Sequence, residues 1–203
     1  MSGTDDKITS LLSEKRHFEP PFEGRDRAHV GDIETYEAAY KRSIENPEDF
    51  WAERAESLVT WFSKWDSVVD ADLHKPEVRW FDEATLNVSC NCLDRHLENG
   101  RRDKTAIIWQ GEPEEEVKTY SYQELYEEVC RFANVLRKKG VKRGDRVSVY
   151  LPMIPELAIS LLACTRIGAI HSVVFAGFSA VSLQNRIQDC EASVLITADA
   201  VLR

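Results

Sequence analysis

The segment 144–179, GDRVSVYLPMIPELAISLLACTRIGAIHSVVFAGFS, constrains the fold of this chain more than any other. It predicts a strand over 146–151, a helix beginning at Pro155 and ending at Gly168, and a strand over 170–175. A strand–helix–strand unit of this length predicts parallel strands joined by a right-handed crossover. Because ligands of open α/β sheets bind beyond the carboxyl ends of strands, the Gly-Phe-Ser turn that follows is a candidate binding wall.

Strands and helices also alternate on both sides of this unit. Further strands are predicted over 105–109, 117–120 and 193–197. Ser121 and Glu124 form a capping box for a helix, whose apolar stripe consists of Leu125, Val129, Phe132 and Leu136. This order predicts an α/β fold that begins a parallel βαβ sheet. The chain stops soon after the last strand, so we expect the sheet to be incomplete and the chain to be the N-terminal piece of a longer protein.

The N-terminal half has a different character, and we predict three domains or segments. Residues 1–35 read as a polar tail, 36–100 as a mostly helical cap, and 101–203 as the start of the α/β domain. Within and just ahead of the cap, helical spacing predicts helices over 33–44, after Pro47 and over 91–98, and 80–86 is interpreted as a short strand and turn. An aromatic cluster in the cap lacks alternating basic residues, so we interpret it as a docking element rather than a base-stacking surface. Its members are Trp61, Phe62, Trp65, Trp80 and Phe81.

The charge balance excludes several classes of partner. The formal net charge is −9, from 35 acidic and 26 basic side chains. A basic surface is what nucleic acid and anionic membranes attract, so we expect neither as a partner. No apolar run reaches membrane-spanning length and no secretory signal is evident. The odd count of five cysteines predicts a reduced, cytoplasmic protein.

Most motifs that carry chemistry are absent from the sequence. There is no G-x-G-x-x-G, Walker loop, G-x-S-x-G or H-E-x-x-H. Cys90 and Cys92 lack a second ligand pair at zinc spacing, so we predict packed thiols and no metal. Asp94 and Glu98, one helical turn apart, are interpreted as surface pairs with their basic neighbours rather than as a catalytic dyad. His171 is interpreted as a hydrogen-bonded core residue.

One constellation remains as a candidate site. Phe175 and Gly177 lie where a predicted strand ends, and Ser179 is placed to cap the next helix. Gly177 would let a ligand approach the backbone, and Phe175 could lie against a flat ring. Arg203 follows the next strand, and its guanidinium matches a phosphate. A tight turn with a solvated arginine is equally consistent with the spacing.

Four segments carry a resemblance to a known family. They are YEAAYKRSIENPEDFW (36–51), RWF (79–81), LNVSCNCLDRHLENGRRDKTAIIWQGE (86–112) and the region from YSYQELYEEVCRFANVL (120–136) through the 144–179 unit. Together they resemble the acetyl-CoA synthetases, the AMP-forming acetate–CoA ligases of the adenylate-forming superfamily. The resemblance covers nearly all of residues 36–203. It implies that 36–100 is the family's N-terminal cap and 101–203 the start of its AMP-binding domain.

The resemblance also implies a reaction and a set of substrates. Acetate and ATP, with Mg²⁺, would give acetyl-adenylate and pyrophosphate, and the thiol of CoA would then give acetyl-CoA and AMP. A propionate-preferring relative and a non-catalytic α/β binding module are the alternatives.

The family's CoA nucleotide site corresponds to Phe175, Gly177 and Arg203, with Ala176 where many members carry a second glycine. The family's phosphate loop, acetate-pocket tryptophan, hinge aspartate and catalytic lysine have no counterpart in these residues. We therefore expect no catalytic residue here and no activity from this chain alone.

Overall fold

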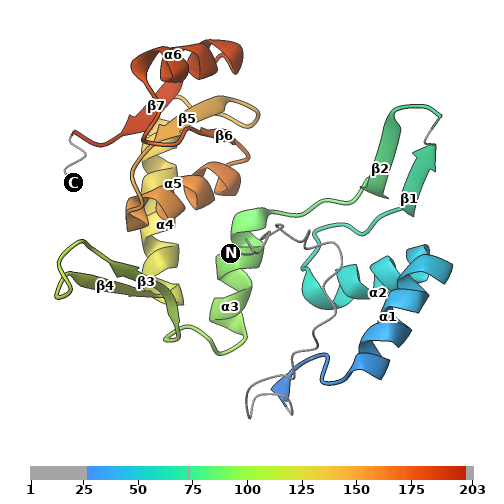
Figure 1. The fold of residues 1–203 in the computed structure, drawn as a ribbon. Helices are drawn as coiled ribbons and strands as arrows, with labels where there is room; N and C mark the ends of the chain where they lie inside the picture. Colours follow the sequence, from blue (N-terminus) through green and yellow to red (C-terminus); the bar gives the residue numbers. More distant parts are fainter. Residues whose placement is uncertain (1–26, 73, 200–203) are drawn as a thin grey trace, which may run out of the picture. The chain divides into compact units, whose positions relative to one another are not determined.

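The computed structural model describes residues 27–72 and 74–199. The chain divides into two compact units, Met1–Phe50 and Trp51–Arg203 (Figure 1). Most of the predicted tail over 1–35 lies outside the described residues.

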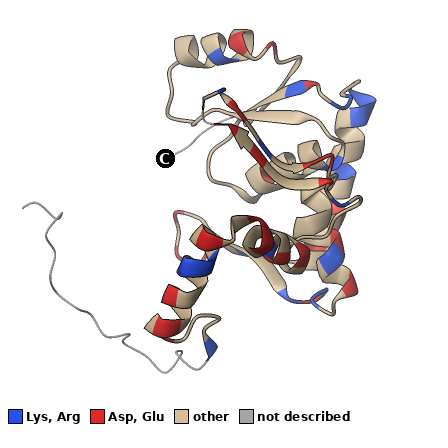
Figure 2. Cartoon of the chain, turned by 90° about the vertical axis from the view of Figure 1, so that its right-hand side faces the viewer, with Lys and Arg blue, Asp and Glu red and all other residues tan. Residues whose placement is uncertain are grey.

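The first unit contains helix α1, Ile33–Glu45, and the start of α2, Pro47–Leu58. The carboxylate of Asp32 accepts a hydrogen bond from the backbone N–H of Thr35 at 2.7 Å, which satisfies a free donor in the first turn of α1. The helix ends at Asn46 because Pro47 disfavours helical backbone in the residue before it. Both predicted helices are confirmed to within about one turn at their ends. Acidic residues outnumber basic ones in both helices (Figure 2).

In the second unit, the rest of α2 is followed by a hairpin that the sequence analysis missed in part. Strand β1, Ser67–Asp72, pairs antiparallel with β2, Glu77–Asp82. The short strand and turn predicted over 80–86 match the end of β2 and the turn at Glu83, but β1 and the first residues of β2 were not predicted. The backbone leaves the extended conformation at Phe81 and Glu83, whose φ angles are 52° and 60°. The rings of Trp61, Trp65 and Phe81 pack on one another with centroids 5.0 to 5.4 Å apart.

The predicted helix over 91–98 forms as two short pieces. A π-helical turn, η3, spans Cys90–Asp94, and α3 spans Arg95–Glu98. The side-chain amide of Asn91 exchanges two hydrogen bonds with the backbone of Thr60, at 2.8 and 2.9 Å. Leu93, in the π-turn, is almost fully buried in the main core. The π-helical turn is therefore bonded to Thr60, which precedes the β1–β2 hairpin, and is packed through Leu93 into the core of the α/β part.

A second hairpin leads into the long helix. Strands β3, Thr105–Gln110, and β4, Val117–Ser121, pair antiparallel. Helix α4, Tyr122–Lys138, follows directly. The Oγ of Ser121 accepts from the N–H of Glu124 at 3.2 Å, and the Glu124 carboxylate accepts from the N–H of Ser121 at 2.7 Å. This confirms the predicted capping box.

Three parallel strands form the sheet that the opening segment predicted. Strand β5, Arg146–Tyr150, lies between β6, Ile170–Val173, and β7, Val194–Thr197. Helix α5, Pro155–Arg166, joins β5 to β6, and α6, Ala180–Asp189, joins β6 to β7. Figure 1 shows α6 on one side of these strands and α5 on the other. The predicted α/β class, with N-terminal helices followed by a parallel sheet, is confirmed.

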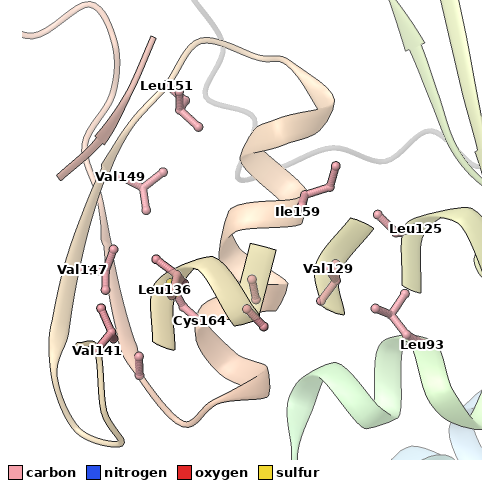
Figure 3. Close-up of a cluster of buried hydrophobic side chains, with 13 residues drawn as sticks. Leu93, Leu125, Val129, Leu136, Val141, Val147, Val149, Leu151, Ile159 and Cys164 are labelled. Carbon is pink, nitrogen blue, oxygen red and sulfur yellow. The ribbon is translucent and has the colours of Figure 1, made fainter. Parts of the chain in front are cut away.

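The core lies between the sheet and helices α4 and α5. Val147 and Val149 of the central strand are completely buried and point toward these helices (Figure 3). From the helices, Val129, Leu136 and Cys164 fill the space between them. Of the two cysteines in these helices, Cys164 is completely buried and Cys130 is half-buried.

Candidate functional site

The candidate site lies where two adjacent parallel strands send the chain to opposite faces of the sheet. After β5 the chain passes through 151–154 to α5, and after the neighbouring β6 it passes through 174–179 to α6. The two connections diverge at the carboxyl edge of the sheet. In open α/β sheets this arrangement creates a crevice that binds ligands.

The turn after β6 is closed by one backbone hydrogen bond. Strand β6 ends at Val173, two residues earlier than predicted, although the N–H of Val174 still donates to the carbonyl of Val149 at 2.9 Å. The N–H of Phe178 donates to the carbonyl of Phe175 at 3.0 Å and closes a four-residue turn. Ser179 caps α6 through its Oγ, which accepts from the N–H of Ser182 at 3.3 Å, as predicted.

Tyr150, the last residue of the central strand, reaches across to this turn. Its hydroxyl lies 2.8 Å from the carbonyl oxygen of Ala176 and 3.0 Å from that of Phe178. The two carbonyls flank Gly177 and converge on one donor. The sequence analysis did not single out Tyr150, because nothing in a strand pattern shows which turn a terminal side chain meets.

Two aromatic rings form the outer surface of the turn. Phe175 and Phe178 are 66% and 42% exposed, and their rings meet edge to face with centroids 5.8 Å apart. Arg186 belongs to α6, and its guanidinium carbon lies 4.5 Å from the centroid of the Phe178 ring. A cation over an aromatic face is attractive and orients the ring. Arg186 is a second site residue that the sequence analysis missed.

The ring of Phe175 packs closely on Gly177. A Cβ atom at position 177 would lie 2.6 Å from Cε1 of Phe175, so a side chain there would displace this ring. The structure thus brings together two of the three predicted site residues, Phe175 and Gly177. Arg203 lies outside the described residues. Strand β7 ends at the same edge of the sheet, since Thr197 pairs with Tyr150.

Asp94 has a role different from the predicted surface pairing. Its carboxylate receives two hydrogen bonds from Arg166 of α5, at 2.8 and 2.9 Å, 72 residues away along the chain. The guanidinium also lies 4.8 Å from the centroid of the Tyr126 ring. The hydrogen bond to Asp94 raises the pKa of Arg166 above its usual value. The pair is structural, because both members are largely enclosed and bonded to each other.

Two histidines, His96 and His171, are enclosed to different degrees. His96 is buried against the ring of Tyr122, with centroids 4.8 Å apart, and burial lowers its pKa. His171 is half-buried in β6, and its buried Nδ1 has no hydrogen-bond partner, so the expectation of a hydrogen-bonded core residue was wrong for that atom. Neither lies in the turn.

Other parts of the structure offer little chemistry. Among residues 27–72 and 74–199, no group of three or more metal-ligating side chains comes together. Within the same described ranges, every helix is too short or too polar to cross a membrane. A cavity of about 430 Å³ lies between α4, α5 and the end of β7, away from the α6 side. Its walls include Phe132, Leu151 and Ile159 and are mainly apolar.

Comparisons with known proteins place this geometry in a family. The family model described as "AMP-binding enzyme" matches residues 93–203, and the one described as "Acetyl-coenzyme A synthetase N-terminus" matches residues 36–92. The candidate turn lies within the first match.

Several longer proteins with similar sequences are named acetyl-coenzyme A synthetase. A protein named acetyl-coenzyme A synthetase from Alkalilimnicola ehrlichii is 50% identical over 95% of this chain and 30% of its own length. Proteins of that name from Magnetococcus marinus and Alcanivorax borkumensis are 55% and 54% identical over 84% and 85% of this chain, and 26% of their own lengths.

The chain therefore spans between a quarter and a third of the length of these relatives. The matches run through both units and confirm the resemblance seen in the sequence. The fold agrees with them, since N-terminal helices precede a parallel sheet. This chain belongs to the AMP-binding enzyme family, with the acetyl-coenzyme A synthetase N-terminus preceding its AMP-binding region.

Proposed function

We propose that the whole protein is an AMP-forming acetate–CoA ligase. Acetate and ATP form acetyl-adenylate and release pyrophosphate, and the thiol of CoA then displaces AMP to form acetyl-CoA. The observation that carries this proposal is the identity of about half of all positions, over 84 to 95% of the chain, to proteins named acetyl-coenzyme A synthetase.

This chain supplies one wall of the CoA nucleotide site and no catalytic residue. The exposed ring of Phe175 offers a flat apolar face for a base, and Gly177 keeps the adjacent backbone free of a side chain. Arg203 follows β7, whose carboxyl end shares this edge of the sheet, and would pair with a phosphate. ATP and Mg²⁺ bind to parts of the protein outside this chain.

The domain organisation follows from the same proposal. Residues 36–100 form the cap of the ligase and 101–203 begin its AMP-binding domain, with 1–35 preceding both. All five cysteines are free, which supports a reducing, cytoplasmic setting. The remaining partners are the small-molecule substrates alone, without nucleic acid or membrane.

The test is product formation by the full-length protein. With acetate, ATP, Mg²⁺ and CoA it should release AMP and pyrophosphate, whereas the 203-residue chain should release neither. Substantial AMP production by the short chain would show that catalytic groups lie within it. Equal or better use of propionate by the full-length protein would reassign the acid substrate while keeping the reaction.

Arg203 gives a test of the site itself. In the full-length enzyme, Arg203→Ala should raise the KM for CoA roughly tenfold to a hundredfold, because one charged hydrogen bond contributes about 1.5–3 kcal/mol. Acetate-dependent exchange of pyrophosphate into ATP should stay near the wild-type rate. A parallel loss of that exchange would show that Arg203 does not act on CoA.

A further inference from the structure

We propose that Tyr150 is a positioning residue for the CoA nucleotide, acting through the turn 175–178. The inference rests on the proposed function and adds a residue that has not yet been assigned a part in it. Tyr150 does not face the ligand itself. Its hydroxyl holds two backbone carbonyls of the wall against which the nucleotide lies.

The geometry of the two hydrogen bonds makes Tyr150 specific for the turn. A phenol has one proton to donate, and here it is shared between the carbonyls of Ala176 and Phe178, at 2.8 and 3.0 Å. The Ala176 carbonyl belongs to the peptide group just before Gly177, and the Phe178 carbonyl to the peptide group just after Phe178, so the two hydrogen bonds bracket Gly177 and Phe178. Glycine tolerates many backbone conformations, and an anchor on each side of this residue pair favours one of them.

The turn has few other restraints that could do this. Helix α6, which follows it, contributes no buried residue, and the Phe175 and Phe178 rings are both substantially exposed. Within the turn, the remaining restraint on the backbone is the Phe178 to Phe175 hydrogen bond of 3.0 Å. Removing the hydroxyl would therefore let the peptide groups around Gly177 rotate, and the Phe175 ring that packs on Gly177 would move with them.

The other end of the connection is rigid. Tyr150 ends the central strand, next to the fully buried Val149, and pairs with Thr197 of β7. One side chain thus joins the turn after β6 to the strand between β6 and β7. Through it, the turn keeps a fixed position relative to the end of β7, beyond which Arg203 follows.

The experiment compares Tyr150→Phe with Tyr126→Phe in the full-length enzyme. Both changes remove one phenolic hydroxyl and keep the ring, but Tyr126 lies on α4 beside Arg166. Tyr150→Phe should raise the KM for CoA about three- to tenfold, as expected for loss of one or two neutral hydrogen bonds. Its acetate-dependent pyrophosphate exchange, and its kcat/KM with pantetheine, which lacks the nucleotide, should match those of Tyr126→Phe.

The other outcomes of this experiment distinguish failure of the proposed function from failure of the positioning role of Tyr150. A wild-type enzyme that forms no AMP from ATP in the presence of acetate, Mg²⁺ and CoA refutes the proposed function. An active wild type with an unchanged KM for CoA in Tyr150→Phe overturns the positioning role alone. The role is also overturned if exchange, pantetheine use and CoA use all fall together, because Tyr150 would then support only the fold.

Discussion

The two faces of the three-stranded sheet are built in different ways. On the α4–α5 side, Val147 and Val149 are fully buried and α5 contributes five buried residues. On the α6 side the helix contributes none, and the hydroxyl of Ser148 in the central strand lies 3.8 Å from the thiol sulfur of Cys190. The helices on the α4–α5 side therefore supply most of the buried packing of the sheet, whereas the turn that leads to α6 exposes the aromatic rings of the proposed CoA wall.

The largest effect should come from opening a cavity on the packed side. Leu136→Ala, at a side chain that is 2% exposed, should lower the free energy of unfolding by about 2–5 kcal/mol. The neighbouring Val135→Ala, at a position 45% exposed, should cost no more than about 0.5 kcal/mol. Urea unfolding of the chain measures both, and equal costs would refute the distinction between the packed side of α4 and its outer surface.

Breaking the ion pair between Asp94 and Arg166 should have the next largest effect. Their side chains are 29% and 19% exposed, so Asp94→Asn should cost about 1–3 kcal/mol, less than a fully buried pair. Glu98→Gln makes the same chemical change one turn along, at an exposed position, and serves as the control. If both variants unfold at the same urea concentration, the pair contributes nothing to attaching η3 to α5.

A smaller effect should appear as a dependence of stability on pH. Burial lowers the pKa of His96 below its usual value near 6.5, so the unfolded chain binds a proton more readily than the folded one. Stability should therefore fall as the pH drops below about 6.5 toward the folded-state pKa. Urea midpoints at pH 7.5 and pH 5 should differ less for His96→Gln than for wild type, and an unchanged difference would exclude His96 as the cause.

The smallest effect on stability should come from the turn itself. Phe175→Ala removes a ring that is 66% exposed and should change the free energy of unfolding by about 0.5 kcal/mol or less. In the full-length enzyme the same change should raise the KM for CoA, because the flat face of the wall is lost. A stability loss comparable to that of Leu136→Ala would erase the separation between the two sides of the sheet.

Local patterns were sufficient for most elements of the α/β part. Ser121 and Glu124 lie three residues apart, and Pro155 and Gly168 bracket a single helix, so short-range chemistry specifies where α4 begins and where α5 begins and ends. The β1–β2 hairpin was harder, because its strands lack a strict alternation and its end depends on the positive φ of Phe81 and Glu83.

Pairings between distant residues could not be predicted in this way. Asp94 has basic neighbours at short range, yet it binds Arg166, which the fold of α5 against η3 brings beside it. In the same way, the strand pattern ends at Tyr150 without indicating that its hydroxyl meets the carbonyls around Gly177.

The amino-acid sequence was sufficient for the class of fold, the order of strands and helices from residue 105 onward, the family, and the turn proposed to contact a ligand. These depend on periodicity, caps and short motifs, which act over a few residues. Which side chain anchors that turn follows only from the tertiary structure. It depends on close approach between segments far apart in sequence, since the Tyr150 hydroxyl lies 2.8 Å from the carbonyl oxygen of Ala176.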